Sequence, residues 1–177
     1  MDTFQNLSSR KTIRNFNGKP ITDQQLNQIL DTAYLAPIGR AKYDSLMLTV
    51  ITNPDFLDKL QKATALAFGD PNARPLYDAP MLILVSSQFA TPEMHNVSYS
   101  NCAIVVQNMA IGATELGVGA CHIWGAIRAL NQNPELLEQL NLPQGFVPCC
   151  AIALGQTDEK YTVREVIKNR INTQYFK

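Results

Sequence analysis

A short basic segment near the N-terminus carries side chains suited to binding an anion. Arg10, Lys11 and Arg14 surround the hydroxyl-bearing Thr12 within five residues. Arginine offers phosphate a planar fork of donors, lysine a compact charge, and threonine a short neutral donor. The segment alone leaves two interpretations open, because a few solvated charges at a surface loop or helix start give the same pattern.

The composition restricts what such an anion site can serve. The chain has 177 residues, of which 46% are apolar and 17% charged, and this predicts a single domain over residues 1–177. Its 15 basic residues equal its 15 acidic residues, so no overall field attracts nucleic acid or an anionic membrane. We find no run of about twenty apolar residues for a membrane helix, and residues 1–11 lack the apolar stretch of a signal peptide. We therefore predict a cytoplasmic protein that binds its anion locally.

Other kinds of catalytic site have little support in the sequence. The two histidines, His95 and His122, lack partners at metal-ligand spacing, so we predict no metal site. Ser86, Ser87 and Ser98 lack the G-x-S-x-G setting of a hydrolase nucleophile. No G-x-G-x-x-G fingerprint follows a predicted strand, so a nicotinamide is expected to bind transiently rather than in a Rossmann site.

The cysteines lie in apolar stretches without C-x-x-C spacing, which predicts buried, reduced thiols. They are Cys102, Cys121, Cys149 and Cys150. Cys149 and Cys150 are adjacent in a predicted strand, where neighbouring side chains point to opposite faces. We therefore expect these two thiols to lie on different sides of a sheet.

Helix-start signals and short aliphatic runs predict a layered fold. Thr22 and Gln25 form a capping-box pattern, and Asn53-Pro54 and Asn133-Pro134 each open a further helix. The predicted strands are Leu46–Thr52, Met81–Ser86, Ala120–Trp124 and Cys149–Leu154. Because long helical segments separate the strands, the pattern favours layers of helices and sheet over a β-sandwich.

The helix predicted over Asn101–Leu116 has hardly any polar face. A helix that is apolar on nearly all sides must be covered on nearly all sides. We therefore expect it at the centre of the domain and at a subunit interface. The run Gly117-Val118-Gly119 supplies C-cap chemistry at its end.

A series of motifs resembles the FMN-dependent nitroreductase family. The segment Arg10–Phe16 reads R-K-T-I-R-N-F and is similar to the family's R-R-S-x-R-x-F opening. Further matches follow in the family's order and are Ala36-Pro37, Asp78-Ala79-Pro80, Gln107-Asn108-Met109, Ala113–Gly119, Leu142–Phe146 and Ala153-Leu154-Gly155. Together these motifs cover almost the whole chain.

The resemblance implies an α+β fold, a three-layer α/β/α sandwich with a mostly antiparallel central sheet. It also implies an obligate homodimer with two FMN sites at the interface. The tail Ile171–Phe176 would then cross to the partner and extend the partner's sheet. Tyr175 and Phe176 agree with that exchange, and docking of the tail on its own subunit would also account for them.

The resemblance implies FMN as the cofactor and assigns residues to its phosphate end. Arg10, Thr12 and Arg14 match the family's phosphate and ribityl binders, and Lys11 lies between them. Lys168 and Arg170 match a basic pair near the family's C-terminus that closes around the same phosphate. The resemblance thus turns the basic segment into half of a phosphate clamp.

The resemblance also assigns residues to the flavin ring. Asn72 precedes Asp78 by the spacing at which some relatives place a ring contact. Ile123, Trp124 and Gly125 match the segment whose backbone lies against the isoalloxazine, where an N–H bonds N5 and glycine permits close approach. Two interpretations of Trp124 stay open, a wall of the flavin pocket and an ordinary core tryptophan.

Residues 36–45 depart from the family's common A-P-S-x-x-N-x-Q-P-W text, because the Ser, Asn, Gln and Trp are absent. Gly39-Arg40 with Lys42-Tyr43-Asp44 resembles the variant of a smaller subgroup. This variant implies that Arg40 or Lys42 supplies substitute donors at the pyrimidine edge of the flavin. The short chain further implies that a helical lid over the flavin is missing and that the pocket is open.

The resemblance implies ping-pong transfer, in which NADH or NADPH reduces FMN at N5 and an electron-poor acceptor then reoxidises it. Nitroaromatics or quinones are the implied acceptors. The flavin carries the chemistry, so we assign no catalytic side chain. Two alternatives stay open, a non-catalytic FMN-storing or FMN-sensing protein and a family enzyme with a different reaction, such as flavin breakdown or reductive dehalogenation.

Overall fold

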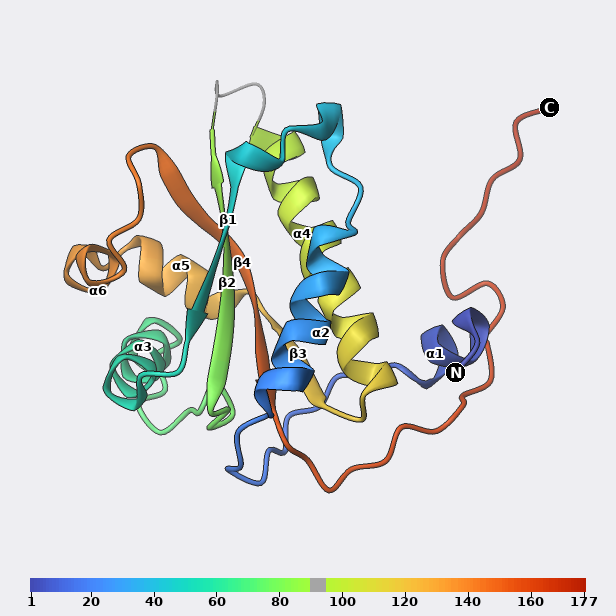
Figure 1. Ribbon diagram of the computed structural model, residues 1–177, viewed down its shortest axis with the longest axis horizontal. Helices are drawn as coiled ribbons and strands as arrows, with labels where there is room; N and C mark the ends of the chain where they lie inside the picture. Colours follow the sequence, from blue (N-terminus) through green and yellow to red (C-terminus); the bar gives the residue numbers. More distant parts are fainter. Residues whose placement is uncertain (90–94) are drawn as a thin grey trace.

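Helices pack on both faces of one four-stranded sheet. The computed structural model describes residues 1–89 and 95–177 (Figure 1). In chain order the elements are α1 (Thr3–Ser9), α2 (Asp23–Tyr34), the 3₁₀ turns η1 (Gly39–Ala41) and η2 (Tyr43–Ser45), β1 (Leu46–Ile51), α3 (Pro54–Ala67), β2 (Met81–Gln88), α4 (His95–Glu115), β3 (Gly119–Ile123), α5 (Gly125–Asn131), α6 (Pro134–Gln139) and β4 (Phe146–Gly155). All four predicted strands are present, with small shifts at their ends.

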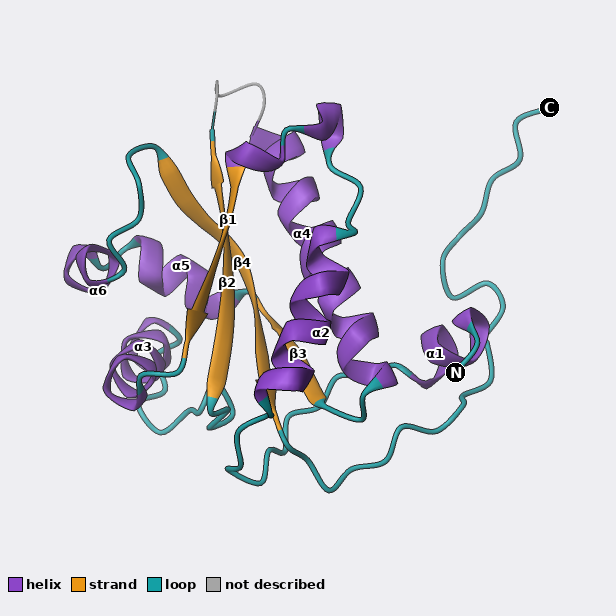
Figure 2. Ribbon diagram, viewed as in Figure 1, coloured by secondary structure: helices purple, strands orange, loops and turns teal. Residues whose placement is uncertain are grey.

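The sheet order is β1-β2-β4-β3, and every neighbouring pair is antiparallel. Helices α2 and α4 cover one face and α3, α5 and α6 cover the other, which gives the three layers seen in Figure 2. Each face has its own apolar core, one around Ile83, Ile152 and Met109 and the other around Leu84, Ala153 and Leu60. The predicted three-layer α+β sandwich with an antiparallel sheet is confirmed.

The predicted helix starts form as local chemistry dictates. Thr22 and Gln25 make both hydrogen bonds of the capping box before α2. Asn53 and Asn133 cap α3 and α6, and each side chain accepts the backbone N–H of the third helical residue, two positions after the proline that begins the helix. Each of these devices uses residues within four positions of one another. Sequence alone was therefore sufficient to predict them.

The long helix α4 starts at His95, six residues before the predicted Asn101, and ends at Glu115. Its end is a Schellman motif, in which Val118 N–H donates to the Ala113 carbonyl at 2.8 Å and Gly117 takes a left-handed φ of 68°. The inward side is buried against the sheet, but Ala103 and Ile104 are exposed. Within one chain α4 is thus central and still has an uncovered apolar strip.

All four cysteines are free and buried, as predicted, but the expected separation of Cys149 from Cys150 is wrong. The register between β2 and β4 shifts at Val85/Ser86, where Cys150 pairs with Val85 and Pro148 with Ser86. This bulge leaves Cys149 as an extra residue and cancels one step of the side-chain alternation. Both thiols therefore join the core on the α4 face, which also contains Cys102.

The last part of the chain, residues 156–177, forms no helix or strand and runs back past α1 (Figure 1). Its first half is tied down, since Thr157 Oγ1 donates to the Asn15 carbonyl at 2.8 Å and Arg164 N–H donates to Ser8 O at 3.2 Å. The apolar side chains of its second half are exposed. They are Val166, Ile167, Ile171, Tyr175 and Phe176. None of the helices in the described part of the chain combines the length and apolarity needed to cross a bilayer.

Helices α2 and α4 approach each other closely at one glycine. A Cβ on Gly112 would lie 2.8 Å from Thr32 Cγ2 and 3.0 Å from Thr32 Oγ1. We expect Gly112→Ala to lower the free energy of unfolding by about 1–3 kcal/mol, because overpacking outweighs the higher helix propensity of alanine. Urea denaturation at fixed protein concentration measures this loss.

Two further variants test the cause of that loss. Thr32→Ser in the Gly112→Ala background removes Cγ2 and should recover part of the stability. Ser100→Ala, at an exposed position of the same helix, should stay within about 0.5 kcal/mol of the wild type. A Gly112→Ala protein as stable as the wild type would contradict the close packing of α2 against α4.

Candidate functional site

The basic segment lies along the outer edge of β3. Arg10 is the C-cap residue of α1. Three residues on, Ile13 N–H donates to the Ala120 carbonyl of β3 at 2.9 Å. The Ile13 side chain is completely buried, whereas Arg14 is exposed and Thr12 is half-buried. Because neighbouring residues of an extended chain point to opposite sides, burial of Ile13 directs its neighbours outward. The sheet edge therefore presents the basic side chains to solvent.

Arg14 contacts an aromatic residue that the sequence analysis did not identify. Its Nε donates to the Tyr77 hydroxyl at 3.2 Å, and its guanidinium carbon lies 5.7 Å from the centre of the Tyr77 ring. The hydrogen bond to Tyr77 is the main reason why the pKa of Arg14 is raised. Tyr77 lies directly before the motif Asp78-Ala79-Pro80, but nothing in that motif indicated an arginine partner.

Lys11 has a partner of its own. Its ammonium forms an ion pair with Glu159 at 2.7 Å, and about a third of each side chain is exposed. Glu159 belongs to the C-terminal segment, so this pair attaches that segment to the edge of β3. Lys11 is thus engaged in a structural ion pair. The residues of the segment that can bind another anion are Arg10, Thr12 and Arg14.

The C-terminal basic pair Lys168 and Arg170 follows a stretch of the tail that contacts the N-terminal segment, but the pair itself makes no contact with it in the described part of the chain. Arg164 donates to the backbone carbonyls of Ser8 and Arg10, and Tyr161 donates to Val118 O at 2.7 Å. Burial raises the pKa of Tyr161 to about 12. Lys168 and Arg170 are exposed, and within the described residues neither forms an ion pair or side-chain hydrogen bond with Arg10–Arg14.

The structure places the segment 123–125 at the end of β3. Ile123 is buried, Gly125 begins α5, and Trp124 between them is 66% exposed, which excludes the interpretation of Trp124 as an ordinary core residue. The Trp124 ring lies 6.2 Å from that of Tyr99 on α4. A Cβ on Gly125 would come 2.3 Å from Phe68 Cζ, so the exposed ring of Phe68 packs directly against this glycine and a larger residue would displace it.

The remaining ring-end candidates lie in two loops. Arg40 and Ala41 take left-handed φ angles of 60° and 52° in the 3₁₀ turn before β1, and both are exposed. The turn is attached to α4, where Gly39 N–H donates to Asn101 Oδ1 at 3.1 Å. Asn72 is exposed in the loop after α3, and its backbone N–H donates to Asp70 Oδ1 at 3.0 Å. No contact joins Arg40 to Asn72 among the described residues.

The candidates therefore form one group along β3 and a separate one at the Arg40 turn, and Asn72 lies in a third place, the loop after α3. Asn6 of α1 donates to the Ile111 carbonyl near the end of α4, whereas Gly39 contacts Asn101 near its start. These contacts are ten residues apart, which is about 15 Å at 1.5 Å per residue. Tyr99, which contacts Trp124, and Asn101 also face nearly opposite sides of α4, because two residues turn a helix by about 200°.

His122 is a further neighbour of the basic segment that the sequence analysis did not assign to the site. It lies on β3, and its pKa is lowered first by partial burial and then by the positive charge of Arg10. A neutral imidazole beside Arg10 can accept a hydrogen bond or donate one through its other nitrogen. Only the pairing of β3 with the basic segment brings these two residues together.

Comparisons with known proteins agree with this fold. A profile described as the Nitroreductase family matches residues 7–156. The chain is 25% identical to the FMN reductase [NAD(P)H] of Bacillus subtilis (strain 168), over 90% of this chain and 67% of that protein.

Solved structures share the fold. A nitroreductase with bound FMN from Desulfitobacterium hafniense DCB-2 has a TM-score of 0.80 at 20% identity, covering 96% of each chain. Another FMN-bound nitroreductase, from Bacteroides fragilis NCTC 9343, has a TM-score of 0.79 at 24% identity, covering 96% of this chain and 97% of that one. At this identity the structures show a shared fold. The profile match spans more than half of the sequence, and the chain therefore belongs to the Nitroreductase family.

Proposed function

We propose that this protein is an FMN-dependent NAD(P)H oxidoreductase that reduces nitroaromatic, quinone or similar electron-poor acceptors by ping-pong hydride transfer. The observation that carries the proposal is the basic segment Arg10–Arg14, fixed along β3 by Ile13, with the exposed Trp124 at the end of the same strand. Family membership and the FMN reductase [NAD(P)H] relative support the cofactor and the electron donor.

The residues along β3 fit the two ends of FMN. A phosphate carries up to two negative charges and accepts strong hydrogen bonds from arginine and hydroxyl groups, and Arg10, Arg14 and Thr12 supply these. The exposed rings of Trp124 and Phe68 supply apolar surface for a flat aromatic ring. FMN bound there accepts and donates hydride at N5, while the chain binds the phosphate, orients the ring and limits access of water.

Lys168 and Arg170 complete the phosphate clamp in this proposal. The Arg164 guanidinium contacts the Arg10 carbonyl, and the Cα of Lys168, four residues on, lies within about 14 Å of the Cα of Arg164, since an extended residue spans at most about 3.6 Å. The ion pair between Lys11 and Glu159 keeps the start of this tail against the segment. In this proposal a movement of the tail beyond the Arg164 anchor brings both cations to a phosphate held by Arg10.

We propose a homodimer, because Arg40 lies apart from the β3 group within one chain. Arg40 or Lys42 of a second protomer would then face the pyrimidine edge of the flavin, where positive charge stabilises an anionic reduced ring. Asn72 would contact the ring from the same protomer as Arg10. The uncovered Ile104 of α4 and the exposed tail agree with such an interface, since an apolar surface of this kind is expected to be covered. In this arrangement residues 171–176 cross to the partner's sheet.

The remaining assignments extend the same proposal. We propose residues 1–177 as one FMN-binding domain, placed in the cytoplasm, and the Gly39–Asp44 segment as the mark of a smaller subgroup of the family.

One observation favours an alternative function, a non-catalytic FMN-storing or FMN-sensing protein. This observation is the altered turn at Arg40, which replaces the family's usual ring contacts. A different flavin reaction is the other alternative, and analysis of the products would identify it.

The absorption spectrum of the purified protein, taken before and after anaerobic addition of NADH or NADPH, tests the proposed function directly. We expect a bound-flavin spectrum that bleaches with at least one nicotinamide and returns when a quinone is added. A yellow protein that neither nicotinamide reduces would favour storage or sensing. A colourless protein that takes up no added FMN would contradict both functions.

Loss of the phosphate clamp should release the flavin. Each hydrogen bond to a charged group contributes about 1.5–3 kcal/mol, so Arg10→Ala combined with Arg170→Ala should weaken FMN binding by about 100-fold or more. Fluorescence titration of the apoprotein with FMN measures this. Lys59→Ala combined with Arg128→Ala removes the same charge from exposed positions on α3 and α5 and should leave the Kd unchanged. Stoichiometric FMN retained by the Arg10/Arg170 variant would contradict the clamp.

A mixed dimer tests whether two protomers build each site. We expect the Arg10→Ala and Arg40→Ala homodimers to lose turnover, and a heterodimer of one chain of each kind to regain about half. One of its sites combines the intact Arg10 of one chain with the intact Arg40 of the other. Two differently tagged Arg10→Ala chains serve as the control. A heterodimer no more active than the two homodimers would show that Arg10 and Arg40 serve the site of one chain.

A further inference from the structure

Two consecutive non-glycine residues adopt the left-handed backbone conformation shortly before β2. Tyr77 has a φ of 58° and Asp78 a φ of 55°. Side chains other than glycine adopt this region rarely and at an energetic cost, so such a pair persists only where surrounding contacts determine it. The sequence before it, Arg74-Pro75-Leu76, contains no glycine that could relieve the turn.

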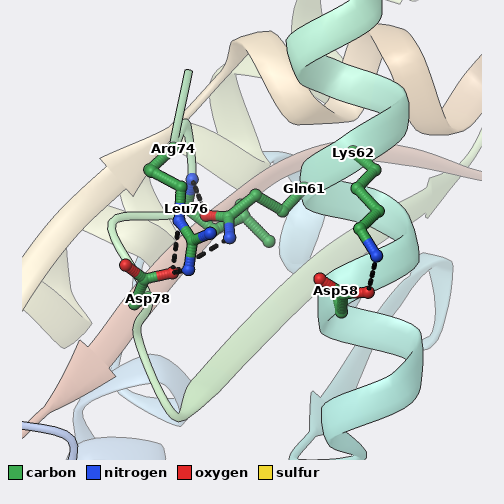
Figure 3. A network of polar contacts seen from close by, with 6 residues as sticks. All are labelled: Asp58, Gln61, Lys62, Arg74, Leu76 and Asp78. Carbon is green, nitrogen blue, oxygen red and sulfur yellow. Dashed lines mark hydrogen bonds and ion pairs between the residues drawn. The ribbon is translucent and has the colours of Figure 1, made fainter. Parts of the chain in front are cut away.

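A polar network around Asp78 determines this turn (Figure 3). The Asp78 carboxylate accepts from Arg74 Nε at 2.8 Å, from a second nitrogen of Arg74, and from Gln61 Nε2 at 3.0 Å. Gln61 is a buried residue of α3, and its Oε1 accepts the backbone N–H of Leu76 at 3.3 Å. The single amide of Gln61 thus attaches the turn to α3 at two points.

The turn fixes the direction of Tyr77. Its backbone N–H donates to Arg74 O at 2.8 Å, and Ala79 N–H donates to Leu76 O at 3.1 Å, so both sides of Tyr77 are closed by backbone hydrogen bonds. Its hydroxyl then accepts from Arg14 Nε at 3.2 Å. Tyr77 is therefore the link between the network on α3 and the basic segment on β3.

The contact with Tyr77 involves the Nε atom of Arg14 and not its terminal nitrogens. A guanidinium has five N–H donors in a rigid plane, and the bond to Tyr77 occupies the Nε donor. Cys121 of β3 is a further neighbour of the group, and among the described residues no oxygen accepts from its terminal nitrogens. Fixing Nε fixes the plane of the group, and the four terminal N–H donors remain for an anion. A long arginine side chain that is already ordered loses less rotamer freedom when it binds.

We propose that Asp78, with Gln61 and Arg74, is a positioning residue that holds Tyr77 and, through it, aims Arg14 at the phosphate of FMN. The inference rests on the proposed function and deepens it, since it adds residues that do not themselves touch the phosphate to the affinity for FMN. Tyr77 touches Arg14 directly, and Asp78 acts through Tyr77.

Two variants test this proposal by FMN titration of the apoprotein. Asp78→Ala removes the carboxylate at the centre of the network, and Tyr77→Phe removes only the hydroxyl. We expect Asp78→Ala to raise the Kd for FMN by about 5- to 30-fold and Tyr77→Phe by about 5-fold. Removing a negative charge near an anion site would by itself strengthen binding, so weaker binding reports lost positioning.

A double-mutant cycle separates positioning from general damage. In the Arg14→Ala background, Asp78→Ala and Tyr77→Phe should have no further effect on the Kd for FMN, because the residue that they position is gone. Riboflavin, which lacks the phosphate, should bind all six proteins of the two cycles alike. Asp78→Asn keeps a carbonyl oxygen for Gln61 and tolerates the left-handed backbone, so it should recover much of the FMN affinity.

Asp58 provides the matched control (Figure 3). It lies on α3 one turn before Gln61 and forms an exposed ion pair with Lys62 at 2.6 Å. Asp58→Ala therefore removes an acidic group and an ion pair from the same helix and should leave the Kd for FMN unchanged. Thermal unfolding of each apoprotein verifies that the variants are folded.

The outcomes distinguish this inference from the proposed function. Wild-type protein that binds no FMN would overturn both. If Arg14→Ala weakens FMN binding but Asp78→Ala does not, the FMN site stands and the positioning role is wrong. An equal loss from Asp78→Ala with and without Arg14 would also overturn that role, because the effect would then be independent of the residue it is said to aim.

Discussion

The pairing of the N-terminal segment with the edge of β3 is the interaction on which the candidate site depends. One backbone hydrogen bond, from Ile13 to Ala120, and the complete burial of the Ile13 side chain fix an otherwise irregular stretch. The same pairing covers a sheet edge that would otherwise expose unpaired backbone groups. Because the strand leads from this segment to Trp124, the residues proposed to bind the phosphate and those proposed to contact the flavin ring lie along one strand.

The second constraint is the length of α4. The helix separates the turn at Arg40 from the contacts of α1 and keeps the two groups of candidate residues apart within one chain. Its inner side belongs to the core, while Ile104 and neighbouring small residues stay uncovered. A helix with this distribution is suited both to support the sheet and to meet a second copy, which is why the proposed site draws on two protomers.

Contacts between distant segments explain what the sequence analysis missed. Arg14 and Tyr77 are 63 residues apart, and Lys11 and Glu159 are 148 apart, so no local pattern connects them. The bulge opposite Ser86 changed the direction of Cys149, because the strand pattern predicts alternation and contains no sign of an extra residue. Trp124 was ambiguous for a related reason, since its exposure depends on segments distant in the sequence, such as α4, whose Tyr99 ring lies 6.2 Å from that of Trp124.

The sequence by itself determined the helix starts at Thr22, Asn53 and Asn133, the four strands and the Nitroreductase motifs. Capping and strand burial depend on residues a few positions apart, and the motifs are visible as text. Only the tertiary structure decided which basic groups meet, which of them are already paired, and that Arg40 lies elsewhere. These facts depend on the packing of β3, α3 and α4 against one sheet, and such long-range packing leaves no periodic trace in the chain.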